Sequence, residues 1–171
     1  MDDDDDQKAI AGILQQLLAQ PTFYQLRAVE QLGYVVKGSV FQYKRMMHFS
    51  ILVQSSAKDA DYLEHRVNEF LESYTKKEVA FEEKDVEAVR QATINKLKQK
   101  VMSLAEEASG NWDALAREEF EFNRREKMIE AYSKVKWEDV NALFEEVFFR
   151  NPRRLNLKIH SHAHKEQVES R

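Results

Sequence analysis

The sequence predicts an α+β fold in which a small antiparallel sheet packs against several helices. Helices and strands are segregated along the chain, in the expected order α-α-β-β-α-α-α-α-β, and do not alternate as in a nucleotide-binding βαβ fold. A length of 171 residues, with 43% hydrophobic and 33% charged residues, is typical of one folded domain with its own core. We expect that domain over residues 9–164, after an acidic disordered or tag-like segment (1–8) and before a flexible tail (165–171).

The first third of the chain predicts two helices followed by a hairpin. Apolar residues recur at helical spacing in Ile10, Ile13, Leu14, Leu17 and Leu18. Pro21 suits the first turn of a second, short helix, and Gly33 is expected to end it as a left-handed cap. Two β-rich runs follow, over 34–40 and 47–53, joined by a loose polar loop over 41–45.

The rest of the chain is predicted to be helical until a final strand. Helical stripes run over 63–74, 86–104 and 140–147, and a further helical pattern follows a break or kink at Gly110–Asn111. Leu155, Leu157 and Ile159 alternate with polar residues, which predicts a strand with one wet face. A sheet of three strands is marginal unless helices cover it or another strand joins it, and the sequence begins directly on a helix, so we expect something to be missing upstream.

Composition excludes several functional classes. The net charge of −4, without a strong basic cluster, argues against a nucleic-acid partner, and the absence of cysteine excludes disulfides and thiolate chemistry. No apolar run approaches the roughly 18 residues of a spanning helix, so we expect a soluble protein with no membrane partner. A glycine-rich phosphate loop, G-x-S-x-G, H-E-x-x-H and H-x-x-E-H are all absent from the sequence.

Other candidate sites have simpler explanations. His160, His162 and His164 share one face of the expected final strand and could bind zinc, but an exposed polar strand end explains them better. The pairs Glu118–Glu119 and Glu145–Glu146 fit solvated helix faces, without an acid–base role. We therefore expect no bound metal or cofactor in this chain.

Arg27 and Tyr34 are the remaining candidates, at the expected helix–strand junction. A guanidinium and a phenol both donate hydrogen bonds to an acceptor such as a peptide carbonyl or an oxyanion. The commoner arrangement is an arginine paired with Glu30 or Glu64 and a tyrosine packed in a core. The residues alone leave both readings open.

The sequence around Arg27 and Tyr34 favours a functional role for the two residues. The segment LRAVEQLGYVV (26–36) resembles the R-x-x-E-Q-L-G-Y signature in the last domain of the insulinase (pitrilysin) family of inverzincin metallopeptidases. FSILVQSSAKDADYLEHRVNEFL (49–71) resembles the strand and helix that follow this signature. YSKVKWEDVNALFEEVF (132–148) and NPRRLNLKIHSHA (151–163) are similar to the closing helix and strand, so the resemblance covers nearly the whole chain.

The resemblance implies a C-terminal domain of a zinc metalloendopeptidase. In that family, homologous domains form two halves around a peptide chamber, and an H-x-x-E-H helix in the first domain binds zinc. By motif position, Tyr34 would be the catalytic donor to the scissile carbonyl oxygen, and Arg27 and Tyr34 would bind substrate. The partners would be peptide substrates and the N-terminal half of the same enzyme, in the cytoplasm. Since the zinc motif is absent here, we expect the fragment alone to be inactive. The resemblance also implies that the first strand of the domain and the neighbouring domains are missing, so we expect an exposed sheet edge and an apolar patch through which the chain can self-associate.

Two other readings compete with this one. The chain could come from a non-catalytic insulinase-family scaffold or interaction subunit, or it could be an unrelated α+β interaction domain that contains EQLGY. An upstream H-x-x-E-H motif would favour the peptidase, and a degenerate motif would favour the scaffold. Both Arg27 and Tyr34 are present, which favours the peptidase.

Overall fold

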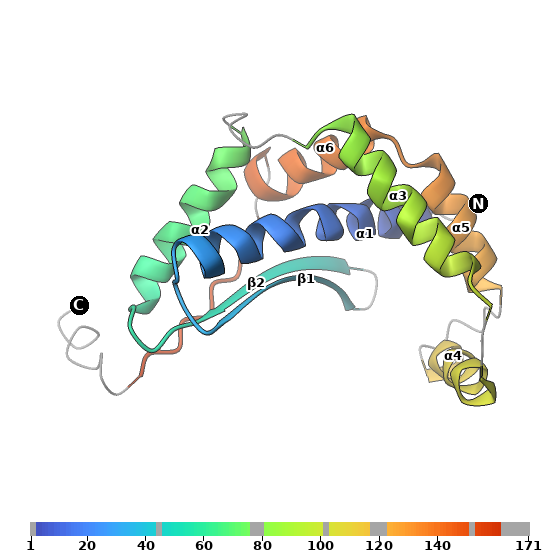
Figure 1. The fold of residues 1–171 in the computed structure, drawn as a ribbon, viewed down its shortest axis with the longest axis horizontal. Helices are drawn as coiled ribbons and strands as arrows, with labels where there is room; N and C mark the ends of the chain where they lie inside the picture. Colours follow the sequence, from blue (N-terminus) through green and yellow to red (C-terminus); the bar gives the residue numbers. More distant parts are fainter. Residues whose placement is uncertain are drawn as a thin grey trace.

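A long helix, a hairpin and a group of shorter helices make up the chain in a computed structural model (Figure 1). The structure describes residues 3–43, 46–75, 81–100, 103–116, 123–150 and 153–161. The α+β class is confirmed: a two-stranded antiparallel sheet lies against helices. Within these ranges, no helix is both long enough and apolar enough to span a bilayer.

Helix α1 (Asp3–Thr22) is the central element, in contact with both strands and with helices on its other side. Its apolar stripe is buried as predicted, with Ile13 and Leu18 fully enclosed. Residues 3–8, expected to be disordered or tag-like, begin this helix, where carboxylates complement the partial positive charge of the helix N-terminus. The predicted interruption at Pro21 is wrong, since α1 continues through it to Thr22.

Strands β1 (Val35–Tyr43) and β2 (Met46–Gln54) form the antiparallel hairpin. They are longer than predicted, and residues 41–43 pair with 46–48 where a loose loop was expected. One face packs on the helices through residues that include Val36 and its cross-strand partner Val53. The other face carries Lys37, Ser39 and Ser50 together with the exposed Leu52, and the Ser39 and Ser50 hydroxyls are hydrogen-bonded across it at 3.0 Å. The pleat therefore separates a core face from a solvated face.

In the described part of the chain, the hairpin is followed by five helices and a short π-helix: α2 (Ala60–Thr75), α3 (Glu83–Lys98), α4 (Leu104–Ala116), α5 (Arg124–Lys134), α6 (Trp137–Glu145) and η2 (Glu146–Arg150). Helices α3, α5 and α6 contact α1 on the side away from the hairpin, whereas α2 contacts the segment that leads from α1 into β1 (Figure 1). Helix α5 was not predicted as an element of its own.

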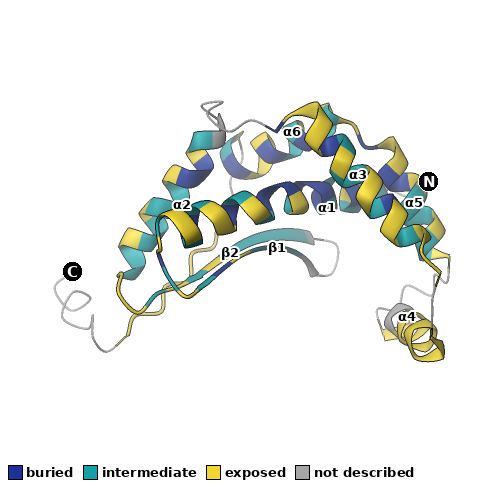
Figure 2. Ribbon diagram, viewed as in Figure 1, coloured by how far each residue is buried: buried dark blue, intermediate teal, exposed yellow. Residues whose placement is uncertain are grey.

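The predicted stripe over 86–104 does not belong to a single helix. Helix α3 ends at Lys98, Val101 lies outside the described residues, and Leu104 begins α4. Helix α4 runs through Gly110 without the expected break, and every side chain described in it is exposed (Figure 2).

An aromatic cluster joins the hairpin to the end of the chain's helical part. The Phe49 ring on β2 meets Phe148 of η2 edge-on at 5.1 Å between centroids. Phe144 of α6 contacts Phe148 at 5.0 Å and Phe81 at 5.5 Å. Aromatic pairs at these distances add specific geometry to the burial of apolar area, so this cluster fixes the sheet against α6 and η2.

The predicted final strand is not part of the described sheet. Residues 153–161 are extended without a strand partner, and Leu155 is 94% exposed, with Leu157 and Ile159 each 83% exposed. The alternate side chains contact α2: Arg154 Nη1 donates to Asn68 Oδ1 at 2.9 Å, and Lys158 Nζ lies 2.7 Å from Asp61 Oδ1. The segment thus has the alternation of a strand, but its polar side is docked and its apolar side is uncovered.

Candidate functional site

The candidate site begins in a π-helix, η1 (Phe23–Val29), which continues directly from α1. Pro21 has no N–H to donate back to the preceding turn, and the widened helix follows immediately. At the other end, the Glu30 N–H donates to the Gln25 carbonyl at 2.9 Å and the Leu32 N–H donates to the Leu26 carbonyl at 3.0 Å. π-helical turns occur frequently at functional sites.

The residue in the left-handed conformation after this helix is Gln31, and the prediction that Gly33 is the left-handed cap is wrong. Gln31 has a φ of 52°, while no described glycine has a positive φ. Gly33 is needed for a different reason: a Cβ there would overlap the carbonyl oxygen of Gln54 and lie 3.1 Å from the Ser55 Cα. Gly33 therefore allows the start of β1 to approach the end of β2 closely.

These backbone constraints bring Arg27 and Tyr34 together. The guanidinium carbon of Arg27 lies 5.5 Å from the centroid of the Tyr34 ring, within the range of a cation–π contact. Tyr34 is 84% exposed, so it is not the core tyrosine of the alternative reading. A cation and a phenol are thus presented together at the surface.

The alternative ion pairs of Arg27 do not form. Glu30 contacts Arg66 of α2 with 2.7 Å between Oε2 and Nε, and Glu64 contacts Lys158 with 2.5 Å between Oε2 and Nζ. Within the described ranges, no carboxylate forms an ion pair with Arg27. None of the described carboxylates therefore neutralises its charge.

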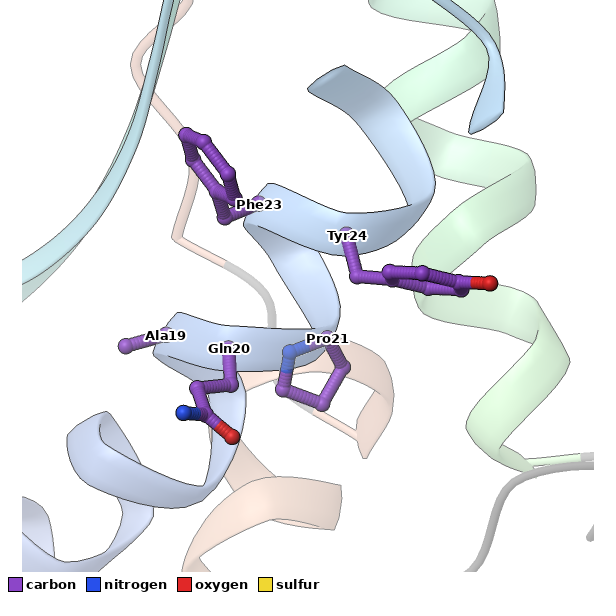
Figure 3. A pocket seen from close by; sticks show the side chains of 5 residues that line it. All are labelled: Ala19, Gln20, Pro21, Phe23 and Tyr24. Atoms are coloured by element: carbon purple, nitrogen blue, oxygen red, sulfur yellow. The ribbon is translucent and has the colours of Figure 1, made fainter. Parts of the chain in front are cut away.

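An open pocket of about 690 Å³ lies at the junction of α1 and η1, just before Arg27 (Figure 3). Phe23 and Tyr24 line it and project in different directions from the helix, and Phe23 is 55% and Tyr24 65% exposed. Ala19, Gln20 and Pro21 complete the lining. Exposed aromatic side chains at a pocket are typical of ligand contact surfaces.

Sequence reasoning missed this pocket, although a signal was present. Phe23 and Tyr24 are consecutive, and two consecutive side chains on a helix cannot both face the core. The pairing of Glu30 with Arg66 had no comparable signal, since 36 residues separate them.

The other candidates from the sequence fall only partly within the described residues. His160 lies on the exposed segment after η2, and His162 and His164 are outside the described residues. Glu145 accepts from Arg150 at 2.6 Å, which fits a solvated helix face, while Glu118–Glu119 also fall outside the described ranges. No group of three His, Asp or Glu in the described part of the chain could hold a metal ion.

Chemically, the site offers donors but no described nucleophile or base. The Arg27 guanidinium and the Tyr34 hydroxyl can both donate to an oxygen of a bound molecule. Such an arrangement can bind a carbonyl and stabilise negative charge as it develops there. Cleavage of a bond would need groups supplied from elsewhere.

Comparison with known proteins identifies the family of the chain. Residues 13–112 match the family described as PQQ synthase PqqF-like, C-terminal lobe domain 4. The chain is 29% identical over 165 residues to the A-factor-processing enzyme of Saccharomyces cerevisiae, covering 96% of this chain and 16% of the relative. It is 25% identical over 154 residues to the peroxisomal insulin-degrading enzyme-like 1 of Arabidopsis thaliana, covering 88% of this chain and 16% of that protein.

A solved structure shows the same fold. The crystal structure of pitrilysin matches 95% of this chain and 19% of the pitrilysin chain, with a TM-score of 0.73 and 22% sequence identity. The chain thus spans less than a fifth of each of these proteins. Together with the family match, these likenesses confirm the expected resemblance: the chain belongs to the PqqF-like C-terminal lobe domain 4 family, a C-terminal domain of the insulinase (pitrilysin) metallopeptidases.

Proposed function

We propose that this chain is the C-terminal, non-zinc-binding domain of a larger zinc metalloendopeptidase, in which it forms part of the peptide chamber and contacts substrate. The observation that carries the proposal is the contact of the half-buried Arg27 guanidinium with the exposed Tyr34 ring, with no described carboxylate paired to Arg27. The relatives are proteases of the insulinase family, which supports peptide hydrolysis as the activity of the whole protein.

In this proposal, Tyr34 is the catalytic residue. Its hydroxyl donates to the scissile carbonyl oxygen of the peptide and stabilises the negative charge that forms there during attack. Removal of one such donor typically costs about 3 kcal/mol of transition-state stabilisation. Arg27 binds a backbone carbonyl of the substrate and orients the tyrosine ring on which it stacks.

The pocket lined by Phe23 and Tyr24, which precede Arg27 in the chain, supports a role in binding peptides. An extended peptide presents backbone oxygens and side chains in alternation. Arg27 and Tyr34 can donate hydrogen bonds to the backbone oxygens, while an apolar side chain of the peptide packs against Phe23 and Tyr24.

Zinc belongs to the whole enzyme in this proposal, and its ligands lie outside this chain. When bound in a peptidase, zinc activates water and polarises the carbonyl. The isolated 171 residues therefore hydrolyse nothing. A fluorogenic peptide incubated with the purified chain and zinc tests this directly, and measurable turnover that copurifies with the chain contradicts it.

The proposed partners are peptide substrates and the N-terminal half of the same enzyme, in the cytoplasm. Self-association through the exposed apolar residues Leu155, Leu157 and Ile159 is a further expected property of the separate chain. The reading frame upstream distinguishes the peptidase from a non-catalytic scaffold. An intact H-x-x-E-H motif there supports the proposal, and a degenerate one contradicts it.

A further inference from the structure

Glu30 is the carboxylate that could most readily neutralise Arg27. The two residues are three apart, a spacing at which an acidic and a basic side chain on an α-helix usually meet. A paired Arg27 would offer less charge to a ligand oxygen, and its guanidinium would be drawn away from the Tyr34 ring. The structure shows the opposite arrangement, with Arg27 on Tyr34 and Glu30 engaged elsewhere.

Both carboxylate oxygens of Glu30 are occupied. Oε2 accepts from Arg66 Nε at 2.7 Å, and Oε1 accepts from Gln25 Nε2 at 2.9 Å. The Glu30 side chain is only 12% exposed. The hydrogen bond from Arg66 also holds the pKa of Glu30 below its ordinary value, so the carboxylate is charged at neutral pH.

The widened helix contributes to this separation. A π-helix hydrogen-bonds each residue to the one five positions on, which brings residues five apart onto the same side. Gln25 and Glu30 are five apart, and they are joined twice, through the backbone at 2.9 Å and through their side chains at 2.9 Å. The turn that would pair Arg27 with Glu30 in an α-helix instead pairs Gln25 with Glu30.

Arg66 completes the arrangement from a different element. It lies on α2 and also contacts Glu69, so it bridges a carboxylate of its own helix and one at the end of η1. Figure 1 shows α2 beside the junction between α1 and β1 from which Glu30 comes. Arg66 therefore fixes the position of Glu30 relative to α2.

We propose that Arg66 and Gln25 are positioning residues that sequester the Glu30 carboxylate and so leave Arg27 free to stack on Tyr34 and bind a substrate oxygen. The role in substrate binding rests on the proposed function above. The sequestration itself is a property of this chain and can be tested without substrate.

The test uses nuclear magnetic resonance on the 171-residue chain. Ring currents of Tyr34 shift the side-chain δ-proton resonances of Arg27 upfield, and Tyr34→Leu identifies this shift by removing it. Arg66→Met releases Glu30, which captures Arg27, so the shift is lost. Arg66→Met combined with Glu30→Gln restores the shift, because position 30 then carries no negative charge to attract Arg27. Glu69→Gln, which removes the other carboxylate partner of Arg66, leaves the shift unchanged and serves as the matched control.

Two results overturn the proposal. The shift could persist in Arg66→Met, in which case Arg66 does not keep Glu30 from Arg27. It could be lost in Arg66→Met and stay lost in the double variant, in which case the loss reflects general disorder of η1. If Arg66→Met fails to fold, Arg66→Gln preserves polar packing without the charge and must give the same loss and the same rescue.

A second readout separates this inference from the proposed function. Loss and rescue of the shift without any effect of Arg27→Ala on peptide hydrolysis by the whole enzyme would support the sequestration and overturn the substrate role of Arg27. If both hold, Arg66→Met raises the KM of the whole enzyme with a smaller change in kcat, and the double variant recovers the KM.

Discussion

The guanidinium of Arg27 is stacked over the ring of Tyr34, with 5.5 Å from the guanidinium carbon to the ring centroid. The contact joins the π-helix to the first residues of the hairpin across the turn at Gln31. Tyr34 is exposed, and Arg27 is half-buried beside it. The R-x-x-E-Q-L-G-Y signature begins at Arg27 and ends at Tyr34. Its spacing is fixed because only the turn between these two residues brings them together.

Gly33 is predicted to be the least replaceable residue of that turn. A methyl group at Gly33 would overlap the Gln54 carbonyl oxygen, which is backbone and cannot rotate away. We expect Gly33→Ala to lower the free energy of unfolding by about 3 kcal/mol, as for a severe overpacking change. Chemical denaturation measures this. The control is Gly110→Ala, where a Cβ meets nothing within 4 Å and the helix should gain about 1 kcal/mol. Equal effects at the two positions would contradict the close approach.

Gly12 in α1 gives a second prediction about packing. A Cβ at Gly12 would overlap the Tyr132 hydroxyl oxygen, whereas the next ring atom, Cζ, is 3.4 Å away. Gly12→Ala alone should destabilise the chain by about 1 kcal/mol, because the clash outweighs the gain in helix propensity. In a Tyr132→Phe background the same change should be neutral or stabilising. A double-mutant cycle of denaturation free energies checks this, and strict additivity would show that the hydroxyl is not the obstacle.

The Glu30–Arg66 contact predicts a specific acid sensitivity. The hydrogen bond from Arg66 lowers the pKa of Glu30 below its ordinary value, so its contribution to stability is present above the ordinary pKa of a glutamate and is lost as the pH falls through the lower folded pKa. The free energy of unfolding of the wild type should therefore fall more between pH 6 and pH 3 than that of Glu30→Gln. Glu107→Gln, on exposed α4, should keep the wild-type slope. If the free energy of unfolding had the same pH dependence in all three proteins, the charge of Glu30 would not stabilise the fold.

The uncovered side of residues 153–161 predicts self-association of the separate chain. Leu155, Leu157 and Ile159 are all more than four-fifths exposed on one side of an extended segment. Sedimentation velocity should show a sedimentation coefficient that rises with concentration, and replacement of all three by serine should reduce that rise. Arg153→Gln, on the same segment, should leave it unchanged. A wild-type chain that remains monomeric at high concentration would contradict the prediction.

The sequence predicted those features that depend on local periodicity. The stripe of α1 repeats at helical spacing and is buried, and the alternation around Phe49 and Val53 correctly gave a hairpin with one face on the core. The final segment also alternates as expected. Its pairing could not be predicted, because a strand needs a neighbour and alternation specifies only which side chains share a face.

The local details of the site depended on contacts that spacing does not encode. Pro21 was expected to break the helix, but the chain continues through it and widens into η1. Gln31 adopts the left-handed conformation, while Gly33 allows close contact with Gln54 at the end of β2. Arg66 reaches Glu30 only because α2 packs beside η1. Such tertiary contacts decide which charges are paired and which stay free.

The most direct test of the account is the steady-state kinetics of Tyr34→Phe in the longer peptidase that we propose carries this domain. Loss of the hydroxyl removes one oxyanion donor, so kcat should fall about 100-fold, by roughly 3 kcal/mol, with little change in KM and an unchanged zinc content. Tyr62→Phe, at a tyrosine that is 41% exposed on α2, is the control and should retain wild-type kinetics. An unchanged kcat in Tyr34→Phe would contradict the central claim that Tyr34 supplies part of the active site.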